Sequence, residues 1–462
     1  MKPRWLIFAV GSVCLLAAAA AAALLLSSRR EVTTSSGAAY RAYREAIENE
    51  HRFYLKEARV GFAKALELDP DFAMAMLGLA RNSDRDQRKS LVERARKQRD
   101  HLTERERLHV EMQYAFGNGK ADEGFRIARS IHEKYPDDAR AAETLAGEQV
   151  AKGNTERAVA IFSELLATDP NNAGAYNQLG YYYAWRGDYE RAIENFQKYR
   201  FLAPAQANPY DSMAEIQAFS GRYDEAIANL NRALAIKPDF YASYGNLGVV
   251  CEGRGEYTRA IEYYQKAADN SVSNGKRSEY LFQALWVAFR IRDRAAAERL
   301  TNQIRSLPKD EYSEVRKSGF EAARNLLENR PAEAERILRE SKPKLDALLA
   351  KSIQLSGYKP YEPAWDYLMG LALTAQGKSA EAITVYEEMA NPPNPWRNLN
   401  DRRWVYEGRA NLAALLARRG DLERAEKLLE ENRKWNPSWA PTRDAEQQVA
   451  QAGRQKSLAA SK

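Results

Sequence analysis

The sequence predicts an all-α solenoid of about ten stacked helix pairs behind one N-terminal transmembrane helix. Two observations predict the solenoid: apolar residues recur at helical spacings of three and four from Ser36 to about Ala445, and turn residues recur every 34 residues. A third observation, an uncharged apolar run near the N-terminus, predicts the transmembrane helix.

Residues 1–30 form the first expected element. Trp5–Leu26 contains 22 residues without a charge, which as a helix would be about 33 Å long, enough to cross the hydrocarbon core of a bilayer. We therefore expect a single-pass membrane protein held through residues 5–26. A cleaved secretory signal is the alternative, because the alanine run Ala17–Ala23 offers small-residue cleavage sites.

The basic residues that flank this run set the expected orientation. Lys2, Arg4 and the terminal amine precede it, and Arg29 and Arg30 follow it. The slight excess before the run favours an inside N-terminus and a periplasmic body in a bacterial cell, and the opposite orientation remains open.

The net charge of +7 comes largely from this N-terminal segment. Residues 1–30 hold four basic and no acidic side chains, so the rest of the chain carries only +3. A mixed surface of this kind does not predict nucleic-acid binding. Arg94–Arg107, which is dense in both signs, is interpreted as one long exposed helix face. The two cysteines, Cys14 and Cys251, do not form a disulfide framework.

After the N-terminal segment we expect a solenoid over 36–272, with a regular block from 105. Further, degenerate repeats are expected over 279–446 and a flexible tail over 447–462. Asn270–Ser278 is a polar loop expected to separate the two sets of repeats. Two more loops, rich in proline, glycine or asparagine, are expected at Ser356–Pro363 and Asn391–Asn400.

The stretch Ala173–Pro204 shows how one repeat is built. Leu179 and Gly180 share one face of a first helix, and Gly187 is expected to end it. Ala192 and Phe196 share one face of a second helix. Counterparts recur at a period of 34, at Gly119, Gly153, Gly187, Gly221 and Gly255, at Pro136, Pro170, Pro204 and Pro238, and at Ala158, Ala192, Ala226 and Ala260.

This pattern resembles the tetratricopeptide repeat, in which an aromatic residue, leucine, glycine, tyrosine, alanine, phenylalanine, alanine and proline recur in that order. The resemblance implies a superhelix with a concave, partner-binding wall. Leu102–Gly119 also resembles a segment in the repeat regions of bacterial sensor and serine/threonine-kinase proteins, where a threonine-x-arginine-glutamate-arginine-leucine helix opens a repeat. That resemblance implies the repeat module without the kinase, whose motifs the sequence lacks.

The sequence predicts no catalytic residue, cofactor, metal site or small-molecule substrate. The four histidines, His51, His101, His109 and His132, are not at zinc-ligand spacing. Gly117–Lys120 lacks the glycine span of a phosphate loop and stands where a repeat needs its turn. An enzyme within the degenerate residues 311–362 is the remaining catalytic alternative.

The expected binding site lies on the first helices of two consecutive repeats, whose concave positions form an aromatic shelf beside two carboxylates. These candidate groove residues are Asn177, Tyr181, Trp185, Asp211, Glu215 and Phe219. Aromatic side chains at such positions are frequent binding anchors, and the carboxylates favour a partner segment that carries lysine or arginine beside an apolar residue. The alternative is that Trp185 and Phe219 pack against the first helix of the next repeat. If the groove site lies elsewhere, we expect it around Trp396 and Trp404.

The sequence therefore predicts a non-enzymatic scaffold or adaptor that presents a groove to a protein or peptide at a bacterial membrane. A regulatory or assembly factor for an envelope enzyme or signalling system is the alternative.

Overall fold

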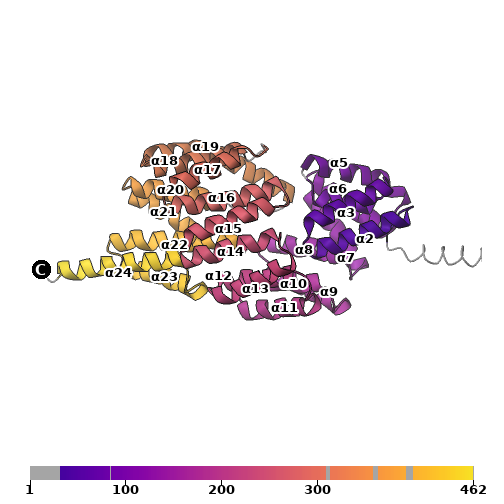
Figure 1. The fold of residues 1–462 in the computed structure, drawn as a ribbon, viewed down its shortest axis with the longest axis horizontal. Coiled ribbons are helices and arrows are strands. Elements are labelled where there is room, and N and C mark those ends of the chain that lie inside the picture. The colour runs from indigo at the N-terminus through magenta and orange to yellow at the C-terminus, as the bar shows by residue number, and fades with distance from the viewer. Residues whose placement is uncertain (1–31, 84, 309–312, 357–362, 392–398, 461–462) are drawn as a thin grey trace, which may run out of the picture. The chain divides into compact units, whose positions relative to one another are not determined.

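The computed structural model describes residues 32–83, 85–308, 313–356, 363–391 and 399–460, and the regular elements in these ranges are all helices (Figure 1). The predicted all-α helical repeat is confirmed for this part of the chain. The apolar run Trp5–Leu26 lies outside the described residues. Among the helices that are described, none has the length and apolar character needed to cross a membrane.

The chain separates into two compact units. The first comprises Met1–Glu50 and Leu55–Gly117, and the second comprises His51–Tyr54 and Asn118–Lys462. The helices of the first unit are α2 (Gly37–His51, whose last residue falls in the second unit), α3 (Leu55–Leu68), α4 (Ala73–Arg81), α5 (Arg85–Lys97), the short 3-10 helix η1 (Arg99–His101) and α6 (Glu104–Gly117).

In the first unit, α6 begins with a reciprocal cap. The Thr103 backbone N–H donates to Glu106 Oε2 at 2.9 Å, and the Glu106 backbone N–H donates to Thr103 Oγ1 at 3.3 Å. The same carboxylate accepts from the Thr33 backbone N–H at 2.6 Å and from the Thr33 hydroxyl at 2.7 Å. Thr103 and Glu106, from the sequence pattern that opens this helix, therefore form a capping box. Glu106 also holds Thr33, close to the first described residue, against this helix.

This cap corrects one prediction. Arg94–Arg107 is not one long exposed helix face, because α5 ends at Lys97 and α6 begins at Glu104. The physical reason is local: Thr103 bonds back to the backbone of the new helix instead of continuing the old one.

The helices of the second unit succeed one another as antiparallel pairs that pack on their neighbours. Their bounds are α7 (Ala121–Lys134), α8 (Ala139–Ala151), α9 (Thr155–Thr168), α10 (Ala173–Trp185), α11 (Tyr189–Leu202), α12 (Asn208–Phe219), α13 (Tyr223–Ile236), α14 (Tyr241–Arg254), α15 (Tyr257–Asn270), α16 (Asn274–Arg290), α17 (Arg294–Arg305), α18 (Ser313–Leu327), α19 (Pro331–Ser356), α20 (Pro363–Ala375), α21 (Ser379–Ala390), α22 (Leu399–Arg418), α23 (Leu422–Trp435) and α24 (Ala440–Ala460).

The repeat predicted over Ala173–Pro204 corresponds to α10 and α11. A Cβ added to Gly180 would lie 2.6 Å from the Phe196 ring, so only glycine lets the two helices approach this closely. Gly187 adopts the left-handed conformation, with φ of 81°, and Asp188 Oδ1 accepts from the Arg191 backbone N–H at 3.2 Å. The predicted helix end and helix cap are both confirmed.

The segments after the regular block are more regular than predicted. The expected polar loop Asn270–Ser278 is short, because α15 continues through Asn270 and α16 begins at Asn274, where the Ser273 hydroxyl accepts from the Lys276 backbone N–H at 3.3 Å. The expected flexible tail is helical as far as Ala460. Val449, which is only 7% exposed, packs in the core there.

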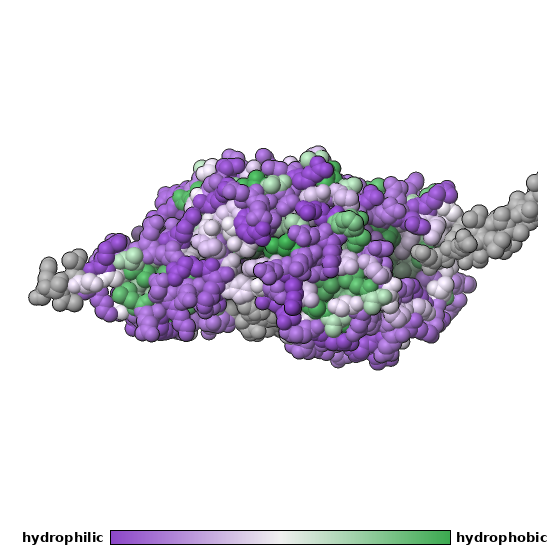
Figure 2. Space-filling model, turned by 90° about the horizontal axis from the view of Figure 1, so that it is seen from below, coloured by the Kyte–Doolittle hydropathy of each residue, from purple (hydrophilic) through white to green (hydrophobic). Residues whose placement is uncertain are grey.

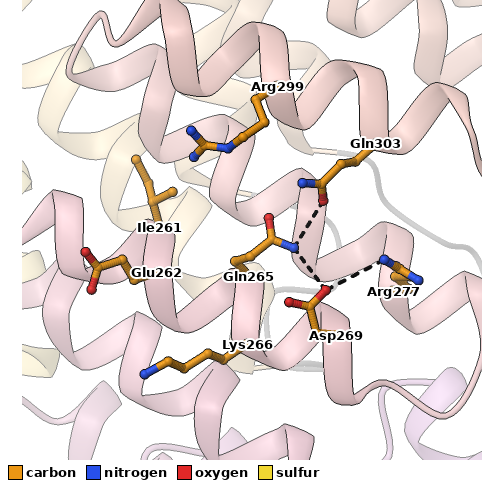
Figure 3. Close-up of a pocket in the computed structure, with 8 residues that line it drawn as sticks. All are labelled: Ile261, Glu262, Gln265, Lys266, Asp269, Arg277, Arg299 and Gln303. Carbon is orange, nitrogen blue, oxygen red and sulfur yellow. Dashed lines mark hydrogen bonds and ion pairs between the residues drawn. The ribbon is translucent and has the colours of Figure 1, made fainter.

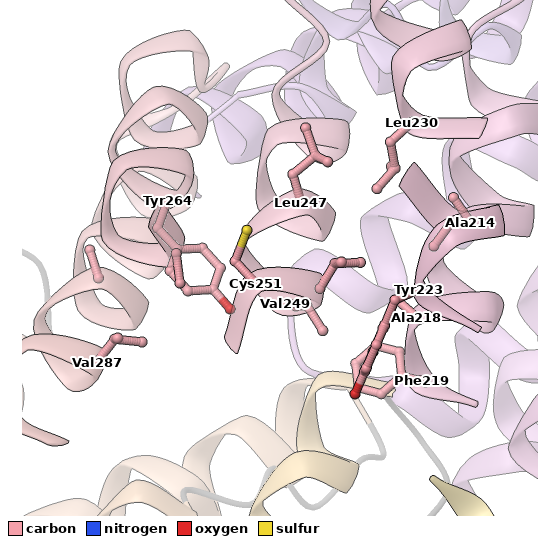
Figure 4. Packing of buried hydrophobic residues seen from close by; sticks show 14 of the residues in the cluster. Ala214, Ala218, Phe219, Tyr223, Leu230, Leu247, Val249, Cys251, Tyr264 and Val287 are labelled. Carbon is pink, nitrogen blue, oxygen red and sulfur yellow. The ribbon is translucent and has the colours of Figure 1, made fainter. Parts of the chain in front are cut away.

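The core of the regular block also takes in residues from the C-terminal helices. Buried side chains of α12, α14 and α15 pack together (Figure 4), and Tyr406 and Trp439 belong to the same cluster. Outside the core, hydrophilic side chains cover most of the face shown in Figure 2, with separate hydrophobic patches between them.

Candidate functional site

The predicted groove residues come together where α10 packs beside α12. The Tyr181 hydroxyl donates to Glu215 Oε2 at 2.8 Å and contacts Ser212 Oγ at 3.2 Å. The Trp185 ring lies 6.4 Å from the Tyr181 ring and 4.9 Å from the Tyr182 ring, centroid to centroid. Tyr181 and Glu215 thus link two consecutive repeats.

Exposure divides the six candidate residues into two groups. Asn177, Tyr181, Trp185 and Glu215 are half-buried and retain accessible surface. Phe219 is 1% exposed and packs in the core, which is the packing alternative raised for this residue. A partner in the native structure therefore has no access to its ring.

Asp211 is also inaccessible. It is 3% exposed, and its Oδ1 accepts from the Ser243 hydroxyl at 2.7 Å and from the Asn246 side-chain amide at 3.2 Å. These bonds tie α12 to α14, so Asp211 holds two repeats together, with its carboxylate already engaged.

The two carboxylates titrate well above their ordinary range. Burial raises the pKa of Asp211 to about 6, against the hydrogen bonds from Ser243 and Asn246, which lower it. Burial and, to a smaller extent, the charge of Asp211 together raise the pKa of Glu215 to about 7, against the Tyr181 hydrogen bond, which lowers it. This wall is thus acidic, and its negative charge increases as the pH rises through about 6 and 7.

The equivalent wall of the next repeat, on α14, is closed. The Tyr280 ring lies directly against Gly245, and Val249 is 2% exposed. Glu252, another predicted concave position, is 1% exposed and pairs with Arg403 of α22, with 3.4 Å between Glu252 Oε2 and Arg403 Nη1. The Tyr264 hydroxyl donates to the same oxygen at 2.9 Å.

A second buried ion pair joins α22 to α16. Arg290 pairs with Glu407, and the Tyr367 hydroxyl donates to Glu407 Oε2 at 3.3 Å. The Trp404 ring lies 5.0 Å from the Trp286 ring, centroid to centroid. The sequence did not predict these two ion pairs, because their residues are 117 and 151 positions apart. Trp404, which the sequence did single out, is covered and only 6% exposed. Trp396 lies outside the described residues.

The segment where α23 ends and α24 begins runs along the inter-helix turns of three repeats. Trp435 contacts Gly187, and a Cβ on Gly221 would lie 2.6 Å from Asn436 Oδ1. Ala440 lies beside Gly255. The glycines that end the first helices therefore also make room for the C-terminal repeats.

A separate open pocket of about 520 Å³ is lined by residues of α15, α16 and α17, and none of them is a predicted groove residue (Figure 3). Gln265 Nε2 donates to Asp269 Oδ1 and to Gln303 Oε1, both at 3.1 Å, and Arg277 lies 3.6 Å from Asp269. Four of its polar side chains, Gln265, Asp269, Arg277 and Gln303, are thus engaged with one another. Among the described residues, no group of three or more His, Cys, Asp or Glu side chains is placed to hold a metal ion.

Three segments, 115–179, 172–198 and 213–274, match family models of the tetratricopeptide repeat. Over these segments the chain carries tetratricopeptide repeats. No curated protein matches it.

Three solved structures are similar to the chain at low identity. Yeast Tom70 is 15% identical, with 90% of this chain and 96% of that chain covered and a TM-score of 0.41. Cut9, in the APC/C hetero-tetramer Cut9-Hcn1, is 13% identical, with 95% and 81% covered and a TM-score of 0.49. MamA is 23% identical, with 34% and 93% covered and a TM-score of 0.29.

Proposed function

We propose that this tetratricopeptide-repeat protein is a non-enzymatic scaffold that binds a partner protein through the groove of its repeats at a bacterial membrane. The observation that carries the binding proposal is the pair between Glu252 and Arg403. A concave carboxylate of the repeats holds an arginine of a helix that also bears an aromatic residue, Trp404. The groove wall is thus chemically suited to a basic, aromatic helix.

The α10–α12 wall is the part of the groove that offers accessible side chains for such a partner. Asn177, Tyr181, Trp185 and Glu215 keep accessible surface, and the acidic wall attracts lysine or arginine by charge complementarity. Aromatic anchors typically supply most of the binding energy of a groove of this kind. The proposed partner segment therefore carries a basic residue beside an apolar one.

The test is a Tyr181→Ala, Trp185→Ala double variant of the full chain, cross-linked in intact membranes. Truncating an anchoring aromatic costs about 2 kcal/mol or more, roughly thirtyfold in affinity, so the cross-linked partner seen with the native chain should disappear. Phe201→Ala is the control, because Phe201 is 84% exposed on α11. Loss of cooperative thermal unfolding in the double variant would show that the two residues serve packing, and retention of the partner would place its site elsewhere.

The membrane location is supported by the uncharged run Trp5–Leu26. The full chain should stay with membranes after a carbonate wash, and a chain that begins at Ser35 should be soluble and helical. Recovery of a mature chain that begins between Ala19 and Arg29 would replace the anchor with a cleaved signal.

A further inference from the structure

The end of the first unit at which the described chain begins carries an inference that rests on the proposed membrane location. We propose that this end is a docking surface for the anionic phospholipid headgroups of the bilayer that holds the chain. This headgroup surface consists of basic and apolar side chains, namely Val60, Lys64 and Leu68 of α3, Arg94 and Lys97 of α5, and Arg99 of η1.

The first argument is the place where the chain enters this unit. The Thr34 hydroxyl donates to Asp69 Oδ2 at 2.5 Å, and Glu106 accepts both the backbone N–H and the hydroxyl of Thr33. Thr33 comes seven residues after Leu26, the last residue of the uncharged run. The covalent chain therefore keeps this clamp within about 25 Å of the end of that run, and so keeps this end of the unit close to the bilayer.

The second argument is that basic side chains surround the same clamp. The turn Asp69–Asp71 follows α3, and the C-terminal end of α5 packs on it. Arg94 Nη2 donates to a backbone carbonyl of this turn at 3.2 Å, and Gln98 Nε2 donates to one of its carboxylates at 2.8 Å. Lys97 and Arg99, which flank Gln98, are exposed. These cations thus lie beside the turn that holds the N-terminal segment.

The third argument is charge complementarity. Helix α5 contains six basic and two acidic side chains. Glu67 pairs with Lys64 at 2.8 Å and Asp100 with Arg99 at 3.7 Å, and all four of these side chains are exposed. Exposed ion pairs contribute little stability, so phosphate groups can replace these carboxylates. Exposed lysine and arginine side chains next to a membrane anchor are attracted to anionic lipid.

The fourth argument separates a lipid surface from a soluble acidic partner. Val60 is 69% exposed and Leu68 is 41% exposed, and exposed Lys64 lies between them on α3. Interfacial helices combine apolar side chains, which enter the headgroup layer, with basic ones, which contact its phosphates. A soluble polyanion would use only the charges. The exposed apolar side chains therefore favour the bilayer.

The experiment uses the full chain in vesicles of phosphatidylcholine with or without phosphatidylglycerol, washed with carbonate and returned to neutral pH. Lysine acetylation is then measured by mass spectrometry. The anionic vesicles should protect Lys64 and Lys97 about fivefold relative to exposed Lys427 of α23, because one basic residue at an anionic surface contributes roughly that factor. Vesicles of phosphatidylcholine alone should give no protection, and high salt should remove it.

An Arg94→Gln, Arg99→Gln variant removes two charges of the headgroup surface and keeps both reporter lysines, so it should lose most of the protection. Arg41→Gln, Arg44→Gln is the matched control, because both arginines are exposed on α2 of the same unit and lie outside the headgroup surface. This control should retain full protection.

Equal acetylation of Lys64 and Lys97 in the two kinds of vesicle would overturn the proposal and leave the anchor in place. Release of the chain by the carbonate wash would overturn the anchor and this inference together, before any acetylation is measured. Equal protection by soluble polyglutamate, added to phosphatidylcholine vesicles, would assign the surface to an acidic protein and overturn the lipid proposal. The groove variant Tyr181→Ala, Trp185→Ala is read by cross-linking, so a failure of the groove is distinguishable from a failure here.

Discussion

The α10–α12 and α14–α16 walls of the proposed groove are built from equivalent repeat positions, yet one is half-open and the other is covered. On the first wall, Tyr181 bonds to Glu215 between neighbouring repeats and both keep accessible surface. On the second wall, Glu252 pairs with Arg403 of a distant repeat. Position within a repeat therefore decides which way a side chain points. Which residues cover that side chain depends on where later helices of the chain pack.

The largest expected effect comes from breaking the half-open wall at its support. Ala192 is fully buried where α11 packs on α10, so Ala192→Trp should overpack this helix pair and cost about 3 kcal/mol of unfolding free energy. Hydrogen exchange should show lost protection in α10–α13 and retained protection in α18–α21, because repeats mainly stabilise their neighbours.

The control for this variant is Gln197→Trp on the exposed face of α11, which should change the unfolding free energy by less than about 0.5 kcal/mol. Uniform loss of protection from α8 to α24 in Ala192→Trp would mean that the two walls belong to one cooperative core.

A matched pair of glycine substitutions isolates the C-terminal docking. Gly153 and Gly187 have φ of 80° and 81°, so alanine at either costs about 1–2 kcal/mol of backbone strain. Only Gly187 also contacts Trp435, whereas a Cβ on Gly153 would meet nothing within 4 Å. Gly187→Ala should therefore lose about 1 kcal/mol more than Gly153→Ala in a denaturant titration and loosen α23 and α24. Equal losses would show that Trp435 contributes nothing to docking.

The smallest expected effect concerns pH. Burial raises the pKa of Asp211 to about 6, above its ordinary 3.8, so the native state binds more protons than the unfolded state between about pH 4 and pH 6. Stability should fall as pH rises through that window. Asp211→Asn keeps an acceptor for Ser243 and Asn246 but removes the buried charge, so it should stabilise the protein by about 1–2 kcal/mol at pH 8 and little at pH 4.

Thermal unfolding from pH 4 to pH 8 measures this effect, with the exposed carboxylate variant Glu190→Gln as control. A pH profile of Asp211→Asn parallel to that of the native chain would show that Asp211 is not desolvated in solution, and that the half-open wall is wetter than the structure indicates.

Much of the local structure was predictable. The period of 34 fixes the helix ends at Gly187 and its counterparts, and the small residue at Gly180 predicts the close approach that Phe196 makes. Asp188 as a cap follows from its place after the turn. Each of these features depends on residues within one repeat, so a linear sequence contains all the information they need.

Two predictions were wrong because they relied on composition, whereas helix capping decides where these helices begin and end. Arg94–Arg107 contains a helix end and a new helix start because Thr103 and Glu106 cap each other. Asn270–Ser278 is mostly helical because Ser273 caps α16. In both stretches a single hydroxyl satisfies backbone N–H groups that polar composition alone would assign to a loop or to a continuous helix.

By itself, the sequence determined the helical repeats and their turns, because periodic apolar spacing and turn glycines act over one repeat length, and it predicted a set of side chains for the groove. Only the tertiary structure decided which of those side chains stay accessible. Asp211 is closed by Ser243 and Asn246 of the next repeat, and Glu252 by Arg403, 151 residues away. Whether a side chain is covered in this way depends on the rotations of many successive helix pairs added together. No local sequence pattern contains that information.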